Sequence, residues 1–249
     1  MRMGIAYLKR DIMFSSKWMF GFFLVTSLNF PHEAFSQNSS QTFVLFPSPH
    51  SAGALGVSTG FSVTLIPRAI AEESLLQLPL IDIRSRYWLT DNLFILGQAN
   101  VVYLTNQVTL GIGWSYSFGS FSLAVSDEVG YWFGFADFQN FESTAMGISN
   151  FPSVAFGIEF EEIFVTFRTE ALIPFGQRTT FGTSSVGRFG PKLAGFAFTL
   201  AVEEELWKNN YFLYGIRVQY SLPLYQTWVA FSSFNRWIVF PGFFIGYEL

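Results

Sequence analysis

The feature that most constrains this chain is a strict alternation of large apolar side chains with small or polar ones. Over residues 55–65 the odd positions carry Leu, Val, Thr, Phe, Val and Leu, whereas the even positions carry Gly, Ser, Gly, Ser and Thr. Residues 108–118 divide in the same way, with Val, Leu, Ile, Trp, Tyr and Phe on one face and Thr, Gly and Ser on the other. A period of two is the period of a β-strand, so each segment is expected to be a strand with one apolar face.

The same alternation continues to the end of the chain and predicts ten strands. Their expected ranges are 55–65, 75–89, 93–104, 108–118, 121–135, 151–161, 163–173, 192–204, 211–222 and 237–249. The connections after the second, fourth, sixth and eighth strands are tight, whereas long loops are expected at 136–150, 174–191 and 223–236. The links at 66–74 and 105–107 are short exceptions to this contrast. Tight turns on one side and long loops on the other are typical of an antiparallel up-and-down barrel with both termini on the periplasmic side.

The face of the strands that carries the large apolar side chains indicates whether the outside of the barrel lies in water or in lipid. The apolar face of the eighth expected strand carries Phe196, Phe198 and Leu200, and the opposite face carries Ala197 and Thr199. So many large rings would overfill the interior of a small soluble barrel, whereas lipid accommodates them outside. The sequence therefore predicts an all-β transmembrane barrel of about ten strands, with eight or twelve also open. A secreted soluble β-barrel or sandwich that binds a small ligand is the alternative.

Aromatic residues make up 20% of the chain, and Trp and Tyr are expected at the strand ends. Their amphipathic rings favour the level of the lipid headgroups, so two girdles should form. The expected girdle on the turn side contains Tyr87, Trp88, Trp114, Tyr116, Trp207, Tyr211, Tyr214 and Tyr247. The expected girdle on the loop side contains Tyr103, Tyr131, Trp132, Tyr220, Tyr225, Trp228 and Trp237.

The N-terminus differs from the rest of the chain. Basic residues at positions 2, 9, 10 and 17 precede an uncharged run over 18–31, and Ala34 and Ser36 supply small residues before a cleavage site. This pattern predicts a signal peptide over 1–36 with cleavage after Ser36. An N-terminal anchor is the alternative, although the run is shorter than the roughly 20 residues that a spanning helix needs. The expected domains are the signal peptide (1–36), a periplasmic tail (37–54) and the barrel (55–249).

Two stretches resemble the bacterial outer-membrane β-barrel proteins. Residues 82–93 resemble the strand, periplasmic turn and strand of such barrels. The last strand resembles their C-terminal assembly signal, with apolar residues at alternate positions: Phe243, Ile245, Tyr247 and Leu249. It departs from that pattern in ending with Leu rather than Phe. The resemblance implies location in the outer membrane, with outer-membrane lipid and the barrel-assembly machinery as partners.

Charged residues on the small face of the strands are expected to meet in the lumen. This predicted lumen cluster contains Asp82, Arg84, Arg86, Glu128, Glu159, Arg168, Glu170, Glu203 and Arg217. Each arginine could reach a carboxylate across a narrow lumen, and the interior of a ten-strand barrel is too small for a wide channel. We therefore expect a lumen largely filled by side chains. A narrow pore or a transport barrel for a small ligand is the alternative.

Other functions lack the residues that they need. The chain carries 14 Lys and Arg against 18 Asp and Glu, so no basic surface for nucleic acid is expected. There is no cysteine, metal-ligand cluster or nucleotide motif, so no cofactor or metal is expected. After signal cleavage His50 is the only histidine left in the sequence. Most hydrolytic mechanisms used by outer-membrane barrel enzymes need a histidine as a base. The sequence predicts a structural or binding protein that acts through its extracellular loops, and not an enzyme.

Overall fold

The structure is a computed structural model that describes residues 42–67, 79–101, 105–138, 141–181, 184–189, 191–207, 210–222 and 236–249. The described residues belong to one compact unit, 40–249. The expected signal peptide and most of the expected loop 223–236 lie outside them. The strands are β1 Leu55–Thr64, β2 Leu80–Trp88, β3 Leu93–Val101, β4 Thr105–Phe118, β5 Phe121–Phe138, β6 Phe141–Asn150, β7 Ser153–Phe160, β8 Ile163–Phe181, β9 Ser184–Phe189, β10 Gly195–Trp207, β11 Asn210–Ser221 and β12 Ile238–Glu248.

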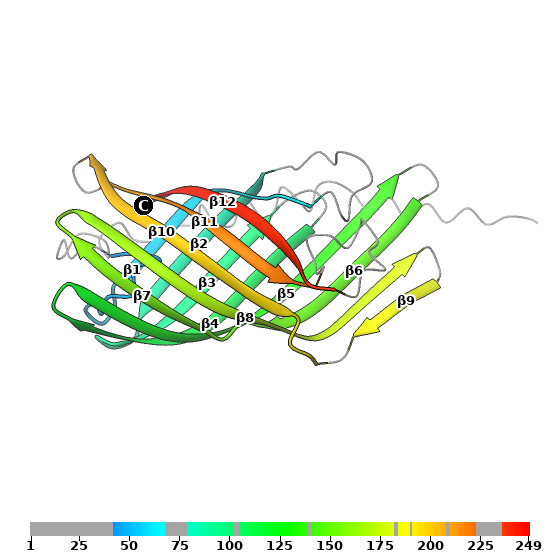
Figure 1. The fold of residues 1–249 in the computed structure, drawn as a ribbon, viewed down its shortest axis with the longest axis horizontal. Coiled ribbons are helices and arrows are strands. Elements are labelled where there is room, and N and C mark those ends of the chain that lie inside the picture. The colour runs from blue at the N-terminus through cyan, green and yellow to red at the C-terminus, as the bar shows by residue number, and fades with distance from the viewer. Residues whose placement is uncertain are drawn as a thin grey trace, which may run out of the picture. The chain divides into compact units, whose positions relative to one another are not determined.

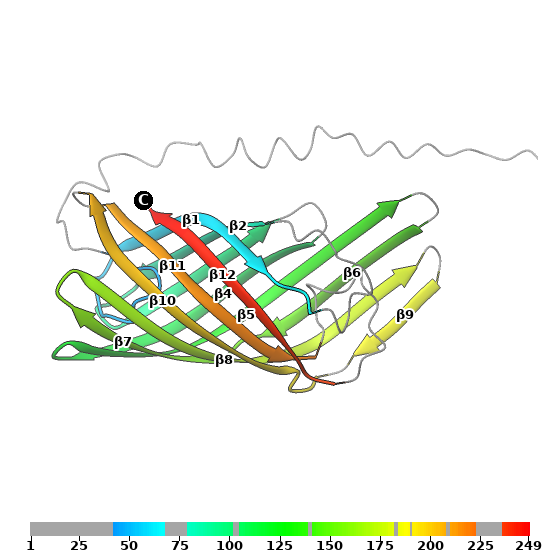
Figure 2. The same ribbon diagram turned by 45° about the horizontal axis from the view of Figure 1, so that its top comes forward.

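These strands close into an antiparallel barrel, as Figures 1 and 2 show. Most strands pair with their neighbours in sequence, except β6 with β7 and β9 with β10, and β12 returns to pair with β1. On one side β10 pairs with β8 and on the other with β11, which completes the circle. An isolated sheet would leave two edges with unpaired N–H and C=O groups, and closure removes both edges.

The barrel has ten strand positions, although the described residues form twelve strand segments. One position is shared by β6 and β7, because the register of β7 on β5 (Ser126 with Ser153) continues into that of β6 (Val129 with Asn150). The interruption lies at Pro152, which has no N–H to donate to a ladder. The other extra segment, β9, lies off this circle and pairs with β8. The predicted fold class, an antiparallel barrel of about ten strands, is confirmed.

Two of the expected long loops are wrong, because the strands continue through them. The expected loop 136–150 contains the end of β5 and all of β6, and the expected loop 174–191 contains the end of β8 and all of β9. These four strands form a sheet that continues past the rest of the barrel (Figure 1). Residues 143–150 keep the period of two, but their small side chains hid it. We call this sheet the strand extension.

The outer surface of the barrel is apolar and the inner surface is small or polar, as the alternation predicted. The exposed side chains include Val108, Leu110, Ile112, Val125, Val154, Phe167, Phe198, Leu200, Ile216, Phe243 and Ile245. Their sequence neighbours Ser115, Ser122, Ala124, Ala155, Thr199 and Ala201 are buried inside. An apolar belt on a closed barrel matches lipid and not water. No helix among the described residues is long and apolar enough to cross a membrane.

The predicted aromatic girdles are right for some residues and wrong for three, and the predicted members Tyr103, Tyr225 and Trp228 lie outside the described residues. Tyr87, Trp114 and Tyr116 are exposed at the turn side of the barrel, and Tyr131 and Tyr220 are exposed toward the other side. Trp88 and Trp132 are buried and point inward, and Tyr211 packs against the buried ring of Phe43 in the interior. The reason is their parity, since Trp88 alternates in phase with Arg84 and Arg86 on the lumen face of β2.

Candidate functional site

The described part of the expected periplasmic tail lies inside the barrel. Phe43, Val44, Leu45 and Phe46 are between 1% and 7% exposed, and they pack against inward side chains at the end where the tight turns lie. We call residues 42–50 the plug segment. It therefore contributes to the lumen filling, which had been expected to come from the strands alone.

Glu203 of β10 holds the plug segment through its carboxylate. One oxygen accepts from the backbone N–H groups of Val44 and Leu45 at 2.9 and 2.8 Å, and the other accepts from that of Phe46 at 2.5 Å. Glu203 is 0% exposed. Three successive N–H groups directed at one anion form a concave binding site, and hydrogen bonds to charged groups are stronger than neutral ones. Glu203 is thus the main polar anchor of the segment.

Arg86 of β2 binds the same segment from the other side. Its guanidinium donates to the carbonyl oxygens of Phe46 at 2.7 Å and Leu45 at 3.3 Å. The guanidinium also lies over the ring of Phe94, 4.6 Å from its centroid. The expectation that each lumen arginine reaches a carboxylate is therefore wrong for Arg86, because both of its terminal nitrogens bind carbonyls of the plug segment.

Aromatic packing completes this end of the lumen. The ring of Phe43 lies 4.0 Å from that of Phe164 and 5.5 Å from that of Tyr211, measured between centroids. Gly157 on β7 leaves the space for Phe46, because a Cβ there would lie 2.5 Å from the Phe46 ring and 2.6 Å from Pro47 Cδ. The apolar run from Phe43 to Phe46, followed by a proline, was the signal in the sequence that could have revealed the plug.

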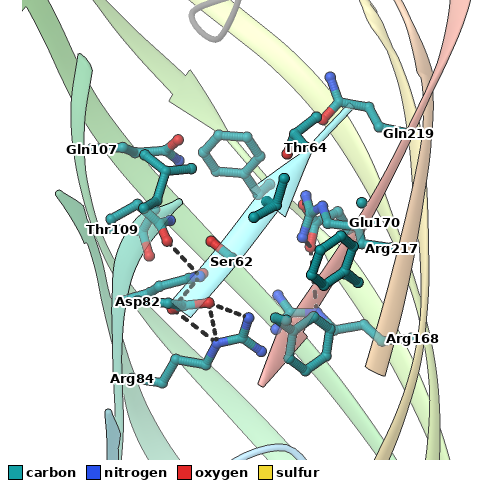
Figure 3. Close-up of a pocket in the computed structure, with 18 of the residues that line it drawn as sticks. Ser62, Thr64, Asp82, Arg84, Gln107, Thr109, Arg168, Glu170, Arg217 and Gln219 are labelled. Carbon is teal, nitrogen blue, oxygen red and sulfur yellow. Dashed lines mark hydrogen bonds and ion pairs between the residues drawn. The ribbon is translucent and has the colours of Figure 1, made fainter. Parts of the chain in front are cut away.

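A layer of ion pairs fills the middle of the lumen. Arg84 pairs with Asp82 at 2.6 Å on the same strand. Arg168 pairs with Glu128 and lies 3.5 Å from Glu170. Arg217 also pairs with Glu170. Figure 3 shows Asp82 and Arg84 on one side of the lumen and Arg168, Glu170 and Arg217 on the other.

Neutral polar groups complete the ion-pair layer. Gln98 donates to Asp82 at 3.1 Å, and the hydroxyl of Thr109 donates to Glu128 at 2.9 Å. Buried charges are tolerated where they are paired and hydrogen-bonded, which is the case for each of these carboxylates. On the side of the layer away from the plug segment, a polar cavity of about 60 Å³ remains, and Gln107 and Gln219 form part of its lining. That volume holds a few water molecules.

The structure brings eight of the nine predicted lumen residues into the interior. Arg86 and Glu203 bind the plug segment, and Asp82, Arg84, Glu128, Arg168, Glu170 and Arg217 form the ion-pair layer. Glu159 does not join them. It is exposed at the turn end of β7, two residues from Glu161, because its strand has already left the barrel interior there.

The C-terminal strand has the facing expected of an assembly signal. Phe243, Ile245, Tyr247 and Leu249 are all exposed on the outer surface. The first three lie opposite Val63, Phe61 and Thr59 of β1, so the last strand also closes the barrel. The role of these residues in assembly stays a prediction.

Ser48 and His50 are the nearest approach to a catalytic pair. The Ser48 hydroxyl lies 2.9 Å from Nε2 of His50, and the imidazole contacts the Trp88 ring at 4.4 Å between centroids. Among the residues that the structure describes, Nδ1 has no carboxylate to orient it, which a hydrolytic triad would supply. These residues also contain no group of three or more His, Cys, Asp or Glu that could hold a metal ion.

Burial makes His50 a pH-sensitive part of the plug. Loss of water, and secondly the charge of Arg86, lowers the pKa of His50 from 6.5 to about 4. The docked segment therefore keeps the imidazole neutral, whereas the undocked one takes up a proton below pH 6.5. Docking is at full strength above pH 6.5 and weakens as the pH falls to 4, by at most about 3 kcal/mol.

We expect hydrogen exchange at the amides of residues 44–46, corrected for its intrinsic rate, to be faster at pH 5 than at pH 7.5. His50→Gln, which cannot gain a proton, is the control and should remove most of this difference. An equal pH effect in both proteins would show that His50 does not control docking.

A closed ten-strand antiparallel barrel with an apolar belt and a polar, filled lumen defines the transmembrane β-barrel class of protein. No protein-family model matches the sequence, and no curated protein matches it. Among solved structures, the chain is similar to Neisserial surface protein A (10% identity, TM-score 0.36, 78% of this chain and 93% of that one). It is also similar to the translocator domain of the autotransporter NalP from Neisseria meningitidis (8% identity, TM-score 0.44, 81% and 89%). The closed barrel described above rests on its own strand pairing and not on these similarities.

Proposed function

We propose that this protein is an integral outer-membrane barrel with a closed lumen and a structural or binding role, rather than a transporter or an enzyme. The observation that carries the proposal is the double closure of the lumen. The plug segment, held by Glu203 and Arg86, fills the end with the tight turns, and the ion-pair layer around Arg168 crosses the middle. A solute would have to displace both.

The strand extension supports a binding role on the outside of the cell. The strand β5 has 18 residues and β8 has 19, whereas a tilted membrane crossing needs about 9–11. The remaining eight or so residues reach roughly 25 Å further along the strand. Phe133, Phe135 and Met146 are exposed beyond Tyr131. Exposed apolar groups on a projecting sheet suit contact with a partner.

The proposal predicts that the purified protein, refolded into planar lipid bilayers, produces no stepwise ion conductance. The reason is that the plug segment and the ion-pair layer both occupy the lumen. Heat-modifiable migration on a gel, in which the folded barrel runs differently from the boiled one, shows that the sample is folded. Discrete current steps from such a folded sample would contradict the closed lumen and favour the narrow pore.

A further inference from the structure

One carboxylate lies on the outer face of the barrel, where side chains that face lipid are expected to be apolar. Asp127 of β5 is exposed on the outside, between the exposed side chains of Val125 and Val129. On the neighbouring strand it lies opposite Ile112, which is also exposed. The predicted lumen cluster did not include Asp127, because its parity places it with the apolar residues.

The position of Asp127 along the strand is central in the apolar belt. On the turn side, four residues away, Leu123 lies opposite Tyr116, and on the other side, also four residues away, Tyr131 lies opposite Val108. Four residues rise about 13 Å along a strand, or about 10 Å along the membrane normal at a tilt of about 40°. An apolar band of about 25 Å therefore has Asp127 near its middle.

The surroundings of Asp127 add further polar groups at this level. The side-chain amide of Asn150 donates to Oδ1 of Asp127 at 2.5 Å and to the Glu128 carbonyl at 3.2 Å. The register places Pro152 across from Asp127. Ala171 donates its N–H to the Pro152 carbonyl at 3.0 Å, but proline has no N–H to return to it. The outer surface thus carries a polar notch where a continuous apolar ladder would be expected.

The polar groups of the notch provide a hydrogen-bond partner for only one of the two carboxylate oxygens of Asp127. Oδ2 of Asp127 has no hydrogen-bond partner among the described residues, and Asp is too short to reach the headgroups from mid-bilayer. An ionisable group in the hydrocarbon region is costly unless it is paired, and such groups mark interaction sites. The Asp127 carboxylate is an anion that already accepts a hydrogen bond from an amide. A positively charged hydrogen-bond donor would complete its interactions. Arg and Lys carry such donors on side chains that a neighbouring membrane segment can present.

We propose that Asp127 and Asn150 form a lateral docking site for a basic side chain, an arginine or lysine that a second transmembrane protein presents at mid-bilayer depth. The proposal rests on the membrane placement of the barrel proposed above. It adds an interaction surface that is separate from the lumen and from the strand extension.

The test uses a model transmembrane helix as the probe. The chain has no cysteine, so Ser120→Cys in the turn between β4 and β5 gives a single site for a fluorescent label. The labelled barrel is reconstituted in dioleoyl-phosphatidylcholine vesicles with a leucine-rich helix of about 20 residues that carries an acceptor dye. One form of the helix has a central lysine and the other has leucine there.

We expect energy transfer to the lysine helix at a peptide-to-lipid ratio at least ten times lower than to the leucine helix. Asp127→Asn, which keeps the shape and a hydrogen bond to Asn150, should abolish that preference. Glu162→Gln is the matched control, because it removes one negative charge at an exposed turn outside the belt, and it should keep the preference.

Three results would overturn the proposal. The first is equal transfer to both helices, and the second is an undiminished preference in Asp127→Asn. The third is transfer between differently labelled barrels that needs Asp127 and no peptide, which would make a second copy the occupant. Protection of the strands from protease in the same vesicles reports insertion separately. If the barrel inserts and the preference is absent, the docking site alone fails, whereas a barrel that does not insert overturns the membrane placement and the site together.

Discussion

Replacement of Leu200 by arginine should abolish most of the folded barrel in lipid vesicles. Leu200 is 44% exposed on the outer face of β10, and its neighbours across the two pairings are Phe167 and Ile216, both exposed and apolar. Arginine at mid-bilayer on this face costs about 2–4 kcal/mol. That is a large part of a folding free energy of about 5–15 kcal/mol. The measurement is the heat-shifted gel band and the free energy of unfolding from vesicles in urea.

The adjacent position provides a control that depends on the sign of the charge. Thr199 is 5% exposed and lies between Arg168 and Arg217 in the two pairings. Thr199→Asp should therefore be tolerated better than Thr199→Lys, because a carboxylate would face two cations. At position 200 both Leu200→Asp and Leu200→Arg should be destabilising, since lipid solvates neither charge. If Leu200→Arg behaved like Leu200→Ala, the apolar belt would not lie in lipid.

Loss of the Glu203 carboxylate should release the plug segment. Glu203→Ala leaves the N–H groups of Leu45 and Phe46 without their acceptor, and it leaves that of Val44 only the long contact to Glu248 Oε1 at 3.5 Å. Each hydrogen bond to a charged group contributes about 1.5–3 kcal/mol, so docking should weaken by several kcal/mol. Chymotrypsin should then cleave the folded barrel after Phe43 at least a hundred times faster than in the wild type, as measured by mass spectrometry.

Two further variants separate the anchor from general effects of lost charge. Glu203→Gln keeps one acceptor oxygen and should give an intermediate cleavage rate. Glu159→Ala removes a carboxylate that is exposed at the end of β7, and it should cleave at the wild-type rate. Because the ion-pair layer around Arg168 and Glu170 lies beyond the plug segment, Glu203→Ala should still fail to conduct in steps. Slow cleavage of a folded Glu203→Ala barrel would show that the aromatic contacts of Phe43 hold the segment without the carboxylate.

The sequence by itself determined which residues face lipid and which face the lumen. Strand side chains alternate by geometry, so parity alone separates Leu200 from Thr199, and Phe243 and Ile245 from Phe244 and Gly246. The same parity places Arg84, Arg168 and Arg217 in the lumen. It also predicts an inward Trp88, although amphipathic composition had suggested a girdle for that residue.

Only the tertiary structure decided what meets what across the lumen. Glu203 and Val44 are 159 residues apart in the chain, and no local pattern pairs a carboxylate with backbone N–H groups so distant. Arg86 likewise pairs with carbonyls 40 and 41 residues away instead of with a carboxylate. The extra length of β5 and β8 also depends on partners, since strands persist only where another strand supplies their hydrogen bonds. Alternation is a property of one strand, whereas lumen filling and strand length depend on register around the closed barrel, and closure brings distant residues together.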